Sequence, residues 1–105
     1  MSWYRQRKMA AQFIDPFPGR DPDNKLADKE IVRAIRQALA GEEEAVHLYD
    51  AIIDATNNEI VQTVLESIRD EERVHIGELQ GTLKRISSEE RELLEKGEKE
   101  VKDIL

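Results

Sequence analysis

The sequence contains no cysteine. Disulfide bonds, thiolate metal sites and cysteine nucleophiles are therefore excluded, and any metal ion must be bound by oxygen atoms and imidazole. Aromatic residues make up only 5% of the 105 residues, whereas charged residues make up 37%. This composition is typical of soluble helices and argues against a β-sandwich or barrel. The length allows one small domain.

Basic residues are fewer than acidic residues. The 16 Lys and Arg against 23 Asp and Glu give a net charge of −7. Nucleic acid is a poor partner for such a chain, because binding to phosphates requires a basic surface. No apolar run approaches the ~18 residues of a membrane span, and the N-terminus has no secretory segment. We therefore expect a cytoplasmic protein that binds neither nucleic acid nor membranes.

The chain divides into an N-terminal arm and a helical domain. All three prolines lie between residues 15 and 22, and proline fixes φ and removes a hydrogen-bond donor. We therefore predict an irregular arm over residues 1–29 and a folded domain over residues 30–105. In the domain, apolar residues recur at steps of three and four from Ile31 to Ile53 and from Ile60 to Ile86, which predicts two long helices.

Capping signals mark the ends of these helices. Asp28 is the predicted N-cap of the first helix, and residues 54–59 break the apolar rhythm with residues that favour turns. Ser87 and Glu90 have the spacing of a capping box, which predicts a shorter third helix. Two helices cannot bury both apolar faces alone. We therefore predict an all-α fold, an antiparallel helical hairpin plus a short C-terminal helix that completes a four-helix bundle by dimerisation.

Three polar residues interrupt the apolar faces at related positions. At about 100° per residue, Glu42 lies at the centre of the first face, and Glu72 and His75 lie within about 40° of the line through Ile68 and Leu79 on the second. An ionised carboxylate there is costly unless it is paired or binds a metal ion. Because residues three apart lie on one side of a helix, Glu72 and His75 can reach one ion. The donors suit iron or manganese and, less exclusively, zinc.

Each of these residues also has a purely structural interpretation. Glu72 and His75 could hydrogen-bond each other or Tyr49 in a polar layer of the core. Tyr49 could donate a hydrogen bond to a ligand carboxylate or serve only as an amphipathic core residue. Glu44 belongs to an acidic run that could attract cations or form an ordinary solvated helix face. We favour a metal site because three polar residues, Glu42, Glu72 and His75, that face the same interior are difficult to explain as an accident.

Two segments resemble the encapsulated ferritins, a family of short relatives of rubrerythrin and ferritin with one helical hairpin per chain. These segments are residues 41–49 (GEEEAVHLY) and residues 70–79 (DEERVHIGEL). The resemblance runs from about Glu30 to the C-terminus. It implies a ferritin-like fold in which two chains share a di-iron centre.

The resemblance also implies a role for individual residues. Glu42, Glu72 and His75 match the ligands of the ferroxidase centre, with manganese or zinc as surrogates for iron, and Tyr49 matches a tyrosine beside it. Glu44 matches an acidic residue on a route by which metal ions reach the centre, where calcium is a further candidate ion. The acidic residue that often precedes the first ligand is replaced here by Gly41.

The activity implied by the resemblance is oxidation of Fe(II) to Fe(III) by oxygen, for iron storage and detoxification. Family members form dimers that assemble into a ring, typically a decamer, inside an encapsulin shell that stores the mineral. Residues 102–105 do not resemble the tail that usually targets free-standing members to the shell. Two alternatives remain open, a rubrerythrin-like di-iron oxidoreductase that scavenges peroxide and a metal-free helical interaction module.

Overall fold

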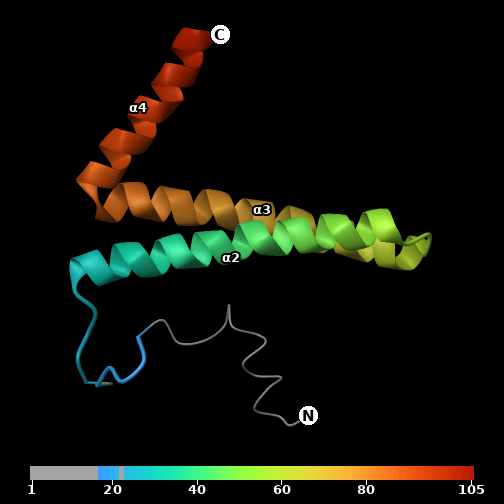
Figure 1. Ribbon diagram of the computed structural model, residues 1–105, viewed down its shortest axis with the longest axis horizontal. Helices are drawn as coiled ribbons and strands as arrows, with labels where there is room; N and C mark the ends of the chain where they lie inside the picture. Colours follow the sequence, from blue (N-terminus) through green and yellow to red (C-terminus); the bar gives the residue numbers. More distant parts are fainter. Residues whose placement is uncertain (1–16, 22) are drawn as a thin grey trace.

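The computed structural model describes residues 17–21 and 23–105. The described part of the chain forms three helices: α2 (Asp28–Ala55), α3 (Glu59–Ile86) and α4 (Ser88–Ile104). Helices α2 and α3 lie side by side and antiparallel, and α4 leaves the end of α3 at a steep angle (Figure 1). The predicted all-α hairpin with a short C-terminal helix is confirmed. Most of the predicted N-terminal arm lies outside the described residues, so its boundary stays a prediction.

The start of α2 differs by one residue from the prediction. Ala27 is the N-cap residue, and Asp28, the predicted cap, is the first helical residue. The reason is that the Glu30 side chain reaches back, and its Oε1 atom accepts a hydrogen bond of 2.9 Å from the Ala27 backbone N–H. This bond satisfies a donor at the helix start without an oxygen on the cap side chain. Asp28 and Glu30 also favour this end of the helix through their negative charge.

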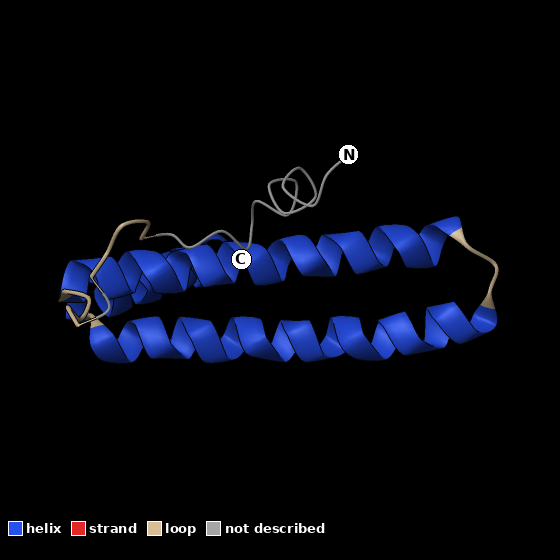
Figure 2. Ribbon diagram, turned by 90° about the horizontal axis from the view of Figure 1, so that it is seen from below, coloured by secondary structure: helices blue, strands red, loops and turns tan. Residues whose placement is uncertain are grey.

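A short turn joins α2 to α3, as the sequence predicts. Asn58 caps α3, because its Oδ1 atom accepts hydrogen bonds from the backbone N–H groups of Ile60 at 3.0 Å and Val61 at 3.2 Å. Gln62 Nε2 donates to the Thr56 carbonyl oxygen at 2.7 Å. This bond ties the first turn of α3 to the end of α2. The turn is visible at one end of the hairpin, where the two helices are linked by a single loop (Figure 2).

Helix α4 packs against one end of the hairpin only. Ser87 is its N-cap, with Oγ accepting from the Glu90 backbone N–H at 3.2 Å, which confirms the predicted cap. The Glu90 carboxylate pairs with Arg36 of α2, so the first turn of α4 is linked to both hairpin helices. Leu83, near this junction, is only 3% exposed and is the one buried hydrophobic residue in the described ranges.

A single chain leaves much of its apolar surface uncovered. Ten large hydrophobic side chains are exposed: Leu48, Ile52, Ile60, Val64, Val74, Ile86, Leu93, Val101, Ile104 and Leu105. None of the helices in residues 17–21 and 23–105 is long and apolar enough to cross a membrane. The uncovered residues lie on all three helices, so the hairpin and α4 each keep an apolar side that no other described helix covers.

The cap of α3 gives a direct test of the turn. Asn58→Ala removes the oxygen that accepts from two backbone donors, and we expect the free energy of unfolding to fall by about 1 kcal/mol. Asn58→Asp keeps an acceptor at the same place and should leave stability within about 0.5 kcal/mol of the wild type. Urea denaturation at one protein concentration measures both. Equal losses in the two variants would contradict the cap.

Candidate metal centre

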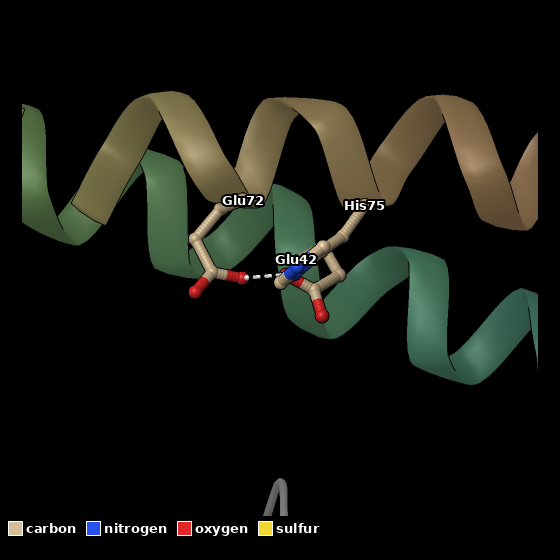
Figure 3. A group of neighbouring side chains, drawn as sticks. All are labelled: Glu42, Glu72 and His75. Atoms are coloured by element: carbon tan, nitrogen blue, oxygen red, sulfur yellow. Dashed lines mark hydrogen bonds and ion pairs between the residues drawn. The ribbon is translucent and has the colours of Figure 1, made fainter. Parts of the chain in front are cut away.

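Helices α2 and α3 bring three residues of types that can bind a metal ion together in the middle of the hairpin. Glu42 comes from α2, and Glu72 and His75 come from successive turns of α3. One ligand atom from each residue lies within 4.8 Å of the other two. The three side chains point toward one another (Figure 3). The structure therefore unites the residues that the sequence singled out, although metal binding by them stays a prediction.

The geometry leaves one carboxylate oxygen without a donor. His75 Nδ1 lies 3.4 Å from Glu72 Oε2 and 3.6 Å from Glu42 Oε2. Glu42 Oε2 is buried, and no group in the described part of the chain forms a hydrogen bond with it. Burial of a carboxylate oxygen without a partner is costly. A cation bound among the three residues would remove that cost, so the cluster fits a metal ion.

The two carboxylates and the imidazole differ in exposure. The side chains of Glu42 and Glu72 are 25% and 20% exposed, whereas that of His75 is 47% exposed. The cluster is therefore covered on the carboxylate side and open to solvent on the imidazole side. Three protein donors leave coordination positions free on an ion such as iron, manganese or zinc. Water, a substrate molecule or a second protein chain can supply the remaining ligands.

Tyr49 and Glu44 lie outside this cluster. Tyr49 is half-buried on α2, seven residues after Glu42, and therefore lies within about 20° of the same line along the helix. None of the described residues forms a hydrogen bond with its hydroxyl group. Glu44 is exposed, and it is not part of the group of ligating atoms around Glu42. Their predicted roles beside the centre and on the route to it stay predictions.

Sequence reasoning missed one contact close to the cluster. Arg69 Nη1 of α3 donates to Asp50 Oδ1 of α2 at 2.9 Å. This hydrogen bond raises the pKa of the Arg69 guanidinium above its ordinary value, although desolvation opposes the shift. The only sequence signal for this contact is an Asp and an Arg beside the two apolar faces. In a chain with so many charged residues, that signal does not identify the pair.

Comparison with known proteins agrees with the fold. The encapsulated ferritin domain from Pyrococcus furiosus superposes on the chain with a TM-score of 0.75 and 26% sequence identity, covering 86% of this chain and 93% of that domain. An encapsulin nanocompartment cargo protein of Myxococcus xanthus is 43% identical over 61 residues, or 58% of this chain. The predicted resemblance to the encapsulated ferritins is confirmed. A ferritin-like–encapsulin shell fusion protein of Pyrococcus furiosus is 28% identical over 82 residues, or 78% of this chain.

The two relatives from Myxococcus and Pyrococcus that are matched by sequence are longer than this chain. The chain covers 46% of the length of the Myxococcus cargo protein and 24% of the length of the Pyrococcus fusion protein. No protein-family model matches the sequence. The likeness to the Pyrococcus domain, in contrast, extends over nearly all of that domain. The hairpin with its C-terminal helix is therefore the unit that this chain shares with the solved structure.

Neutralising one ligand tests whether this cluster binds metal. Glu72→Gln removes a negative charge and a strong oxygen donor while keeping the size of the side chain. We expect its affinity for Fe(II) to fall about 100-fold, since even residues that only support metal ligands change affinity by about 10–100-fold. Anaerobic calorimetric titration with Fe(II) measures the change. The matched control is Glu71→Gln, an exposed neighbour with the same change of charge. If both variants bound Fe(II) equally well, the assignment of Glu72 would be wrong.

Proposed function

We propose that this protein is a ferroxidase, which oxidises Fe(II) to Fe(III) with oxygen at the Glu42–Glu72–His75 cluster. The observation that carries the proposal is the buried Glu42 oxygen without a donor, next to a second carboxylate and an imidazole. Carboxylate oxygens are hard ligands and stabilise the higher charge of Fe(III) more than that of Fe(II). The same three residues therefore hold the substrate ion and favour its oxidised state.

In this proposal two copies of the chain complete the centre. Di-iron proteins with the ferritin-like fold use a Glu from each of two helices and a Glu-x-x-His from each of the other two. One chain supplies Glu42 on α2 and Glu72-x-x-His75 on α3, which is half of that set. A two-fold axis through the open side of the cluster would place two iron ions between the copies. Each chain would then contribute two glutamates and one histidine.

The exposed side chains beside the cluster support a second copy. Val64, His75 and Ile86 are spaced by eleven residues along α3, which is about three turns, so they lie within about 40° of one line. All three are exposed in the single chain. One exposed apolar group therefore lies on each side of the half-exposed imidazole, about 16 Å away along the same side of the helix. A second hairpin packed along this line would bury the apolar groups and cover the metal site at the same time.

The residues around the centre have supporting roles in the proposed reaction. Two Fe(II) ions each lose one electron, and oxygen takes up both electrons and two protons to form hydrogen peroxide. Glu42 and Glu72 neutralise the charge of the ions and hold them close enough for oxygen to contact both. We assign Tyr49 a position beside the centre, where its hydroxyl donates to a ligand carboxylate. We assign exposed Glu44 the attraction of Fe(II), with calcium as a competing ion.

The proposal extends to storage of the oxidised iron. The relatives include an encapsulin nanocompartment cargo protein and a ferritin-like–encapsulin shell fusion protein. We infer that this chain likewise functions with an encapsulin shell, in which a ring of dimers oxidises iron and the shell retains the mineral.

Oxidation of iron by the purified chain tests the activity. The protein is titrated anaerobically with Fe(II) and then exposed to air while ferric absorbance is recorded. We expect saturation near one iron per chain and oxidation much faster than in buffer. Glu42→Gln should slow oxidation about tenfold or more, whereas Glu71→Gln should not. Oxidation no faster than in buffer would contradict the ferroxidase, and oxidation by peroxide but not by oxygen would favour a peroxide-scavenging enzyme.

A matched pair of valines tests the second copy. Val64 lies within about 20° of the His75 line on α3, whereas Val74 lies about 100° from it, and both are exposed. A charged side chain at Val64 would have to be buried between two copies. We expect Val64→Arg to lower the mass measured by light scattering and the iron bound per chain, while Val74→Arg changes neither. If both variants assembled like the wild type, the proposed interface would be in the wrong place.

A further inference from the structure

The contact between Asp50 and Arg69 links α2 to α3 outside the metal cluster. Arg69 Nη1 lies 2.9 Å from Asp50 Oδ1. Apart from the contact of His75 with Glu42, this is the one ion pair between α2 and α3 in the ranges that the structure describes. The side chains of Arg69 and Asp50 are 24% and 48% exposed, so the pair is shielded from solvent on the arginine side only. The three hydrogen bonds of the guanidinium group distinguish it from an ordinary surface ion pair between two extended side chains.

The guanidinium group of Arg69 is held on both of its edges. While Nη1 donates to Asp50, both Nε and Nη2 donate to Asp70 Oδ1 at 3.3 Å. Arg73 also lies 3.5 Å from the same Asp70 oxygen. The planar group can satisfy these bonds in few orientations. Its position on α3 is therefore fixed relative to its own helix, and the bond to Asp50 then fixes α3 relative to α2.

The pair lies close to the metal cluster without being part of it. Arg69 precedes Glu72 by three residues, which is about one helical turn, and lies about 60° around α3 from it. Asp50 follows Glu42 by eight residues, about 12 Å along α2 and about 80° around the helix. Neither residue is among the clustered ligating atoms. Asp50 and Arg69 therefore act on the cluster only through the helices that carry it.

The cluster needs such a restraint because the covalent link between the helices is distant. The turn at residues 56–58 begins fourteen residues after Glu42, about 21 Å along α2. Apolar contacts between two helices tolerate small rotations and shifts, whereas metal ligands must be held to within about 0.5 Å. Polar contacts within an apolar interface are well suited to define such a register. Asp50 and Arg69 lie between the turn and the cluster, where this restraint is needed.

We propose that Asp50 and Arg69 are a positioning pair, which sets the rotation and register of α3 against α2 so that Glu72 and His75 face Glu42. This inference rests on the proposed function, since it assumes that the cluster binds metal. Loss of either partner leaves the helices intact but allows the three ligands to separate. Metal affinity then falls in the folded protein, an effect separate from any loss of stability.

The charges of the two residues allow a sharp experiment. Asp50→Ala removes a negative charge and Arg69→Met removes a positive charge, so a simple field effect on a bound cation would change the two affinities in opposite directions. A positioning role instead weakens both. We expect each variant to bind Co(II) about tenfold more weakly than the wild type, with an altered visible absorption spectrum. Helical content by circular dichroism and mass by light scattering should remain unchanged.

Matched controls carry the same changes of charge at sites that do not join the helices. Asp54→Ala removes an exposed acid from α2, and Arg73→Met removes an exposed arginine that contacts only its own helix. Both should bind Co(II) like the wild type. Arg69→Lys keeps a charge that can reach Asp50 and should recover part of the affinity. If Arg69→Met lost helical content, the Co(II) affinity of Asp50→Ala compared with that of Asp54→Ala would still test the positioning role.

Two different results would overturn the inference, and they are distinguishable. Wild-type affinity and spectrum in both Asp50→Ala and Arg69→Met would show that the pair only stabilises the hairpin. The metal site would then stand without a positioning pair. A wild-type chain that takes up neither Co(II) nor Fe(II) would instead overturn the proposed function, and the positioning role would be overturned with it.

Discussion

The burial of apolar surface is the constraint on which the rest of this structure depends. Two 28-residue helices cover each other along one side only, and α4 packs at one end rather than along the hairpin. Leu83 at that end is the single buried hydrophobic residue in the described chain. The middle of the hairpin, which carries Glu42 and His75, therefore stays open on one side. A metal site at such an open edge is half enclosed by one chain and is suited to closure by another.

The helices were predictable because the signals for them are local. A period of 3.6 residues in the apolar pattern defines α2 and α3, and Asn58 and Ser87 provide the cap oxygens that start α3 and α4. The start of α2 was predicted one residue too late. There the Glu30 side chain substitutes for a cap, and its conformation is not encoded in the residue pattern. The angle of α4 was not predicted either, since it is set by how α4 packs against the end of the hairpin, where Glu90 also pairs with Arg36.

The cluster and its neighbours show where sequence reasoning stops. Glu42, Glu72 and His75 could be singled out because each is a polar residue in an apolar face, which is rare and costly. Asp50 and Arg69 could not be singled out from the sequence, because Lys, Arg, Asp and Glu make up 37% of the chain and most of them face water. To choose the right pair, one must know how α2 and α3 are rotated against each other. That rotation is a property of the packed hairpin and not of either helix alone.

Metal binding and assembly are coupled if two copies share the centre, as we propose. Each chain holds an ion with three donors, and a second chain adds donors while it covers the half-exposed His75. A metal ion that binds more tightly between two chains must, by the same factor, hold the two chains together. The exposed Val64 and Ile86 on the His75 side of α3 and the unsatisfied oxygen of Glu42 would then both be covered by the same second chain. Iron supply would favour the assembled, active form, and its absence would favour separate chains.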